Sequence, residues 1–292
     1  MNEQAPTAAA TEIAPPPQAS IEADVARALA EDLGSGDVTA SLLPDTPQHG
    51  YVIAKQTAVI AGRPWFDACF RALDPEVRID WRIDEGQPVS ANTVLCTLEG
   101  RSHALVSGER CALNFLQTLS ATASSTAEYV AAIAGTRARI LDTRKTLPGL
   151  RLAQKYAVRV GGGENHRIGL FDAVMLKENH ILAAGSIAAA AALAKSRYPQ
   201  LPLIIEVESL DELDQALATG CTRILIDDFS LADMREAVRR SAGRIALEVS
   251  GGVELPRLRQ IAETGVDFIS IGALTKHVHA VDLSMRLGQP PG

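Results

Sequence analysis

The sequence predicts an α/β protein of two domains, in which an α/β barrel follows a smaller N-terminal α/β domain. Two patterns indicate this. In the second half of the chain short apolar runs alternate with helical patterns, whereas in the first half strand-like runs are separated only by turn residues. The composition agrees, because 47% of the 292 residues are hydrophobic and only 4% are aromatic, as in an α/β core rich in Ala, Val, Leu and Ile.

The N-terminal half begins with residues 1–20, which are rich in Ala, Pro, Gln and Thr and have no apolar period. We expect this segment to be a disordered tail. A helical pattern starts at Ile21, and strand-like runs follow at residues 51–60, 77–83 and 94–98. Ser107 is the expected N-cap of a long helix that bridges the two domains.

Six short apolar runs recur beyond this helix, at residues 140–141, 173–176, 203–205, 224–226, 245–247 and 268–271. Helical patterns fill the gaps, for example at residues 210–218, 231–240 and 255–264. Alternating βα units of this length require parallel strands with right-handed crossovers. Six units in a row favour a barrel over an open sheet.

Polar residues follow every one of these runs. They lie at residues 142–145, 177–179, 206, 227–228, 248–252 and 270–272. Barrel enzymes place their chemistry at the C-terminal ends of the strands. The sequence therefore predicts a ring of polar groups around one pocket.

The first part of this ring is cationic, although the formal net charge of the chain is -7. Each of these cations follows an apolar run or a glycine turn: Arg144, Lys145, His166, Arg167 and Lys177. Positive charge on a polar loop of an acidic protein indicates a pocket for a small anion, and the broad basic face of a nucleic-acid-binding protein is absent.

Three further cations, Arg151, Lys155 and Arg159, recur every four residues on a predicted short helix. We interpret them as ordinary surface charges, because most exposed Lys and Arg side chains make only weak pairs.

The later part of the ring is suited to a phosphorylated sugar. Gly251-Gly252 and Gly272-Ala273 each precede a helical stretch, where backbone N–H groups and the helix dipole bind phosphate. Glu206 and Asp227 are suited to ribose hydroxyls or to a Mg²⁺ ion carried on a pyrophosphate. The predicted ligands are a phosphorylated sugar and a second, strongly anionic molecule.

The sequence also bears on localisation. It contains no run of about 18 apolar residues and no recognisable secretory signal. Its four cysteines are scattered without a CxxC pair, which argues against a disulfide framework or a zinc site. We expect a cytoplasmic protein.

Four motifs, DTRKTLPGLR, GGGENHRIGL, LKENH and SIGALTKH, resemble the quinolinate phosphoribosyltransferase family in the same order, over residues 21 to 287. The resemblance implies an N-terminal α/β sandwich (residues 21–121 with 282–292) and an incomplete, seven-stranded TIM-like barrel (residues 122–281). The six apolar runs leave one strand of the seven unassigned. No role is assigned to Lys276 or His277.

The resemblance also implies a reaction. Quinolinate and 5-phosphoribosyl-1-pyrophosphate give nicotinate mononucleotide, pyrophosphate and CO₂, with Mg²⁺, in a homodimer with shared active sites. The implied quinolinate-binding residues are Arg110 of the partner subunit, Thr143, Arg144, His166, Arg167 and Lys177. The implied phosphoribosyl-pyrophosphate residues are the catalytic Lys145, Glu206 and Asp227, with Ser250, Gly251, Gly252, Ser270, Ile271 and Gly272.

Three alternatives remain open from the sequence. The nearest is a paralogous phosphoribosyltransferase that acts on another acidic ring. The second is a barrel lyase in which Lys145 or Lys177 forms a Schiff base, which requires a desolvated lysine. The third is a metabolite-binding protein without catalysis.

Overall fold

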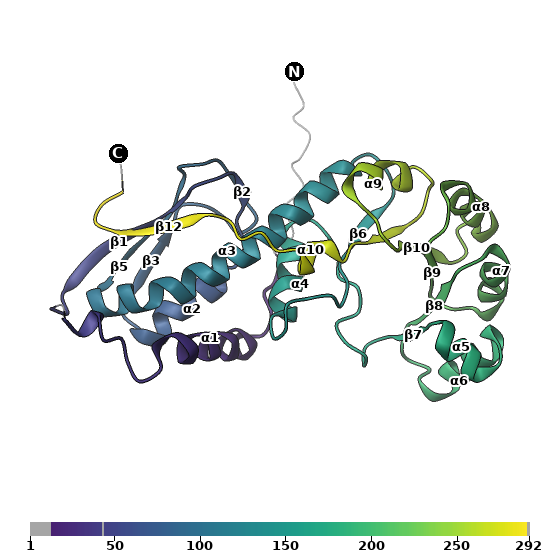
Figure 1. The fold of residues 1–292 in the computed structure, drawn as a ribbon, viewed down its shortest axis with the longest axis horizontal. Coiled ribbons are helices and arrows are strands. Elements are labelled where there is room, and N and C mark those ends of the chain that lie inside the picture. Colours follow the sequence, from purple (N-terminus) through teal and green to yellow (C-terminus); the bar gives the residue numbers. More distant parts are fainter. Residues whose placement is uncertain (1–12, 43, 291–292) are drawn as a thin grey trace, which may run out of the picture.

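A computed structural model describes residues 13–42 and 44–290. Residues 1–12 of the predicted tail lie outside the described residues, whereas residues 18–20 already belong to the first helix, α1 (Gln18–Leu33). Figure 1 shows an elongated molecule with one sheet at each end and a long helix between them.

The N-terminal domain is a four-stranded antiparallel sheet of order β12-β1-β5-β3, with helices against one face (Figure 1). Its strands are β1 (Pro47–Ala54), β3 (Arg78–Trp81), β5 (Val94–Arg101) and β12 (Leu283–Leu287). The helix α2 (Arg63–Leu73) and the short elements η1 (Ala40–Leu42), β2 (Ala58–Val59) and β4 (Pro88–Val89) complete it. The expected strand at residues 51–60 is therefore two strands.

The C-terminal strand β12 belongs to this domain, because it pairs with β1 over the register Val52↔Met285. The apolar faces of sheet and helices share one buried cluster, centred on Trp65, Phe66 and Phe70. The Trp65 indole N–H donates to the buried carboxylate of Asp24 at 3.0 Å, so α1 is held by a polar contact as well as by apolar packing.

The bridging helix is α3 (Ser102–Ala132), which starts five residues earlier than Ser107. The predicted N-cap role of Ser107 is wrong. The residue lies inside the helix, and its hydroxyl donates to Asp37 Oδ2 at 2.9 Å. The apolar surface of α3 extends over its full length, because the helix packs first on the N-terminal sheet and then against the second domain.

The second domain contains a six-stranded parallel sheet of order β6-β11-β10-β9-β8-β7, which confirms the six predicted strands. The strands are β6 (Arg139–Leu141), β7 (Val174–Leu176), β8 (Leu203–Val207), β9 (Arg223–Asp227), β10 (Ala246–Ser250) and β11 (Phe268–Ser270). The helices are α4 (Arg151–Val160), α5 (Glu178–Ala184), α6 (Ile187–Arg197), α7 (Leu210–Thr219), α8 (Leu231–Ser241), α9 (Leu255–Ala262) and α10 (Ala273–Lys276).

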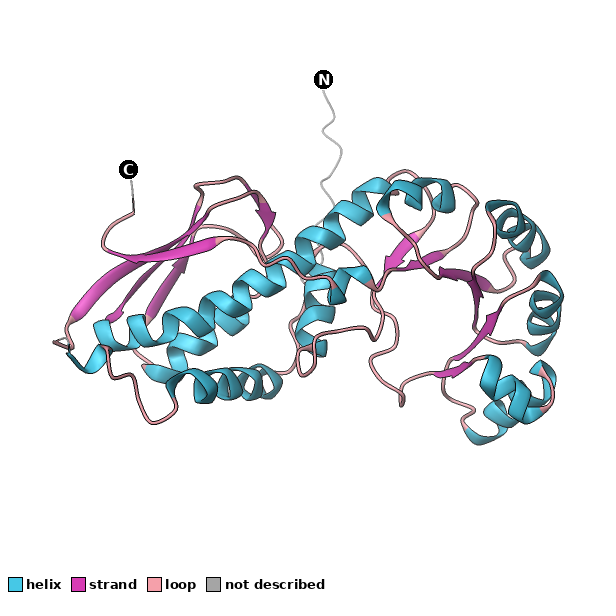
Figure 2. Cartoon of the chain, viewed as in Figure 1, coloured by secondary structure: helices cyan, strands magenta, loops and turns pink. Residues whose placement is uncertain are grey.

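This sheet curves as in a barrel but remains open between β6 and β7 (Figure 2). Glu164 makes an isolated parallel bridge to Leu141, next to β6, where a further strand would continue the sheet. Side chains such as Ile205, Ile226 and Val249 face the outer helices, while the intervening residues face inward. This alternation points Glu206 and Glu248 into the barrel.

None of the helices in the described part of the chain is long and apolar enough to cross a membrane.

Candidate functional site

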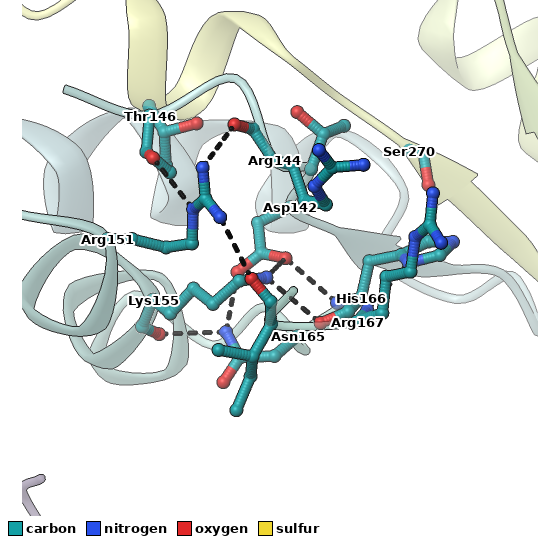
Figure 3. Close-up of polar contacts among 12 residues, drawn as sticks. Asp142, Arg144, Thr146, Arg151, Lys155, Asn165, His166, Arg167 and Ser270 are labelled. Atoms are coloured by element: carbon teal, nitrogen blue, oxygen red, sulfur yellow. Dashed lines mark hydrogen bonds and ion pairs between the residues drawn. The ribbon is translucent and has the colours of Figure 1, made fainter. Parts of the chain in front are cut away.

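Asp142, directly after β6, organises the first part of the strand-end ring (Figure 3). Its side chain is completely buried and accepts from Lys155 Nζ at 2.5 Å, Asn165 Nδ2 at 2.6 Å and the His166 backbone N–H at 2.8 Å. Burial raises the pKa of the Asp142 carboxyl, and the nearby Lys155 opposes that rise. These contacts fix residues 165–167 beside the end of β6.

The interpretation of all three cations on α4 as surface charges is wrong for Lys155. Arg159 is exposed as predicted, but the Lys155 side chain is only 3% exposed and also donates to the His166 carbonyl at 2.9 Å. Arg151 is half-buried and donates to the Thr146 hydroxyl and to the carbonyl of Ile168. A spacing of four residues places side chains on one side of a helix but does not show which of them the rest of the protein covers.

Arg144 and Arg167 supply positive charge that has no carboxylate partner among the described residues (Figure 3). The buried Nε of Arg144 lacks a hydrogen-bond partner, and within the described residues the Arg167 guanidinium donates only to the Ala173 carbonyl and the Met175 sulfur. Burial, followed by repulsion from Arg144, lowers the pKa of Arg167. Two neighbouring, partly desolvated guanidinium groups form a site for an anion.

Lys145 is held at both ends of its peptide unit. Its N–H donates to Thr143 Oγ1 at 3.0 Å, and its carbonyl accepts from Thr275 Oγ1 at 2.8 Å. A Cβ on Gly272 would lie 2.9 Å from Lys145 Cδ and 3.6 Å from Thr143 Oγ1. A side chain at 272 would displace the Lys145 side chain, so the predicted phosphate loop lies against the Lys145 stem.

The buried Gln154 stabilises the same loop. Its amide donates to the Thr275 carbonyl at 2.8 Å and accepts from the Leu147 N–H at 2.7 Å. This role was not predicted, because a single Gln on an amphipathic helix is ordinarily exposed.

The opposite side of the ring is acidic. Lys177 Nζ lies 2.6 Å from Glu206 Oε2, so this predicted substrate cation is paired within the chain. A Cβ on Gly251 would lie 2.8 Å from Asp227 Oδ1, and Gly251 has a φ of +91°. Glycine is needed there both for the left-handed backbone and for the close approach of Asp227. Ser250 and Gly252 flank this contact.

His166, Ser270 and Ile271 are engaged inside the protein. Ser270 donates its hydroxyl to the buried Glu248 at 2.5 Å, and His166 Nε2 lies 3.2 Å from the same carboxylate. The Ile271 side chain is in the core, and its N–H donates to the Leu141 carbonyl at 2.9 Å. Glu248 was predicted only as one of the strand-end residues, although it contacts both His166 and Ser270.

Arg110 lies apart from this ring. It is an exposed residue in the N-terminal half of α3, which packs on the N-terminal sheet, and the site described above is at the strand ends of the other domain. The structure thus brings together the predicted residues from 143 to 272 and leaves Arg110 outside.

An open α/β barrel with unpaired arginines, a lysine against a glycine loop and inward carboxylates at its strand ends defines an anion-binding enzyme of the barrel class. Two family models cover most of the chain: "Quinolinate phosphoribosyl transferase, N-terminal domain" matches residues 37–120, and the C-terminal domain of the same name matches residues 122–286. The chain belongs to the quinolinate phosphoribosyltransferase family.

Individual relatives agree over nearly the whole length. A probable nicotinate-nucleotide pyrophosphorylase (carboxylating) of Synechocystis is 44% identical and aligns over 93% of this chain and 94% of its own. The corresponding protein of Mycobacterium leprae is 39% identical over 90% and 95%. The solved nicotinate-nucleotide pyrophosphorylase of Francisella tularensis superposes with a TM-score of 0.92 at 42% identity, covering 96% of this chain and 100% of that one.

The buried Asp142–Lys155 pair gives a stability prediction. Lys155→Met leaves the Asp142 carboxylate uncompensated in the interior, and we expect a loss of about 3–5 kcal/mol in the free energy of unfolding. Arg159→Met, on the same helix but exposed, should change it by less than about 0.5 kcal/mol. Urea unfolding followed by circular dichroism measures both, and equal losses would show that the pair does not hold this segment.

Proposed function

We propose that the chain transfers the phosphoribosyl group of 5-phosphoribosyl-1-pyrophosphate to quinolinate with decarboxylation, giving nicotinate mononucleotide, pyrophosphate and CO₂. The observation that carries the proposal is the pair Arg144 and Arg167, two partly desolvated cations without a carboxylate partner in the described chain. The family membership and the names of the relatives support it.

Quinolinate suits this pair because it is a planar ring with two adjacent carboxylates, and guanidinium groups bind carboxylates in a bidentate manner. Arg144 and Arg167 bind the two carboxylates, and Thr143 lies at the edge of the same loop. The Lys177 side chain is 44% exposed, so it can bind a carboxylate of quinolinate if its ion pair with Glu206 opens.

The acidic side of the strand-end site binds the sugar. Loss of pyrophosphate leaves an oxocarbenium-like ribosyl group, whose hydroxyls Glu206 and Asp227 hold. Lys145, against Gly272, meets the phosphate groups, and the Ser250–Gly252 turn supplies backbone N–H donors. The ring nitrogen forms the bond to the sugar as the bond to pyrophosphate breaks.

Decarboxylation follows from the new bond. The pyridinium nitrogen carries a positive charge, so the electron pair left at the adjacent carbon when CO₂ departs is stabilised, and a proton then replaces the carboxylate. No residue acts as a nucleophile, and the protein contributes position and fixed charge.

Mg²⁺ is part of the proposal as an ion carried on the pyrophosphate. The described residues contain no cluster of three metal ligands, so the residues present fit an ion held mainly by the pyrophosphate, to which Glu206 and Asp227 would add carboxylate oxygens. Bound there, the ion would supply positive charge against the leaving pyrophosphate.

We also propose that the enzyme is a homodimer in the cytoplasm, in which Arg110 of the partner subunit completes the quinolinate site. Exposed apolar side chains in both domains support the dimer. Val38 and Leu42 are exposed in the N-terminal domain, next to Asp37, which accepts a hydrogen bond from Ser107 of α3. Leu170 and Phe171 are exposed in the loop that follows Arg167. Four buried, reduced cysteines fit a reducing compartment.

The Schiff-base alternative has no support in the geometry. Lys177 is ion-paired to Glu206, and Lys145 is exposed, whereas a Schiff-base lysine needs a desolvated setting that lowers its pKa.

Substrate choice tests the proposal against the paralogous alternative. The protein should convert quinolinate to nicotinate mononucleotide with one CO₂ per product, detected by mass spectrometry. Nicotinate lacks the second carboxylate and leaves one arginine uncompensated, so its kcat/KM should be lower by about 10⁴-fold or more. Similar values for the two acids would contradict the diacid pocket.

Subunit complementation tests the shared site. Arg110→Ala and Lys145→Ala homodimers should each be inactive, because one lacks the donated arginine and the other lacks the lysine of the recipient barrel. After the two are unfolded together and refolded, random pairing should restore about a quarter of wild-type activity, since half the dimers are mixed and each has one intact site. Mixed dimers that are verified by mass yet inactive would refute the sharing of Arg110.

A further inference from the structure

Glu248 is a completely buried carboxylate in the barrel interior, one layer below the site. Its Oε2 accepts from the guanidinium of Arg223 at 2.9 Å, and its Oε1 accepts from the Ser270 hydroxyl at 2.5 Å. His166 Nε2 lies 3.2 Å from that same Oε1. Burial raises the pKa of Glu248, but the contacts with His166, Ser270 and Arg223 outweigh it and the net shift is downward. The carboxylate is therefore ionised at neutral pH.

Arg223, the first residue of β9, binds this carboxylate from the N-terminal end of the strands. The Arg223 guanidinium lies 4.2 Å from the centroid of the Phe268 ring, and Arg139 lies 4.4 Å from the same ring. Arg139 in turn pairs with Glu164 at 2.9 Å. Arg223 is thus held between the Phe268 ring and Glu248 Oε2, which leaves Glu248 Oε1 directed toward Ser270 and His166.

The protons on His166 follow from its two ring nitrogens. Nδ1 accepts a hydrogen bond from the backbone N–H of Arg167 at 2.6 Å, so Nδ1 carries no proton. The single proton of a neutral imidazole then sits on Nε2, which lies 3.2 Å from Glu248 Oε1 without forming a regular hydrogen bond. Lys155, at the His166 carbonyl, and Asp142, at its N–H, contact the backbone of His166 instead of the ring.

We propose that Glu248 is a positioning residue that holds His166 as a neutral Nε2–H imidazole, and that His166 thereby fixes the backbone of Arg167 instead of binding quinolinate through its own charge. The assignment of Arg167 to quinolinate rests on the proposed function, whereas the state of His166 does not.

This chain of contacts explains why His166 is buried in a site that binds an anion. Both of its nitrogens face groups of the chain, and the two carboxylates of the substrate bind to Arg144 and Arg167. Loss of the Glu248 charge frees Nε2, the ring reorients, and the Arg167 N–H loses its acceptor. The guanidinium of Arg167 then samples more positions, which weakens quinolinate binding and leaves the sugar side unchanged.

The first test is spectroscopic and uses the ligand-free protein. Long-range ¹H–¹⁵N correlation of the imidazoles at pH 7, with His166→Asn to assign the signal, should show His166 as the neutral Nε2–H tautomer. A doubly protonated ring or an Nδ1–H tautomer would overturn the proposal. This outcome does not depend on whether the protein makes nicotinate mononucleotide.

The second test uses Glu248→Gln, with Glu164→Gln as the matched control, because Glu164 also loses a charge that faces an arginine stacked on Phe268. Glu248→Gln should shift the His166 signals and raise the KM for quinolinate by about 10-fold, with the KM for 5-phosphoribosyl-1-pyrophosphate within about 2-fold of wild type. The control should leave the His166 signals unchanged.

A folded Glu248→Gln protein with wild-type His166 signals and wild-type quinolinate KM would refute the positioning role. Should this variant fail to fold, the wild-type tautomer still decides the state of His166. In that case Glu248→Asp, which keeps the charge but shortens the side chain, should partly displace the same signals, and unchanged signals would count against the proposal.

Discussion

The site depends on one buried ionic contact, that between Asp142 and Lys155. An isolated buried carboxylate is strongly unfavourable, and this one is tolerated because it accepts from Lys155, Asn165 and the His166 N–H together. Those partners lie in separate segments, on α4 and in the loop that follows it. Satisfying one carboxylate therefore brings both segments to the end of β6, where Arg144 and Arg167 become neighbours.

Three consecutive glycines make this arrangement sterically possible. A Cβ on Gly161 would lie 2.4 Å from the Ala123 carbonyl on α3, and one on Gly163 would lie 2.8 Å from a Thr126 methyl. Gly162 has a φ of +87°, which favours glycine for a different reason. The chain can thus pass closely beside the bridging helix and return to β6. The packing of the long helix and the position of the anion site are consequences of the same turn.

Much of this could be predicted from the sequence, for a physical reason. Parallel strands present their C-terminal ends at one edge, so Arg144, Glu206 and Asp227 were placed together by periodicity alone. Pairing inside the protein was not predictable in this way. Lys155 looks like a surface residue at its spacing, and Ser107 looks like a cap, because local pattern does not encode what packs against a helix face. Glu248 was predicted at a strand end, but its contacts with His166, Ser270 and Arg223 could not be predicted, because these residues come from other strands and loops.

The central claim is that the unpaired arginines form the diacid site. A crystal structure of the protein with quinolinate bound tests it most directly. One carboxylate should lie within ion-pair distance of Arg144 and the other within reach of Arg167, with His166 unmoved beside Glu248. Quinolinate bound with its carboxylates away from both arginines, or with His166 swung out to contact it, would contradict the account.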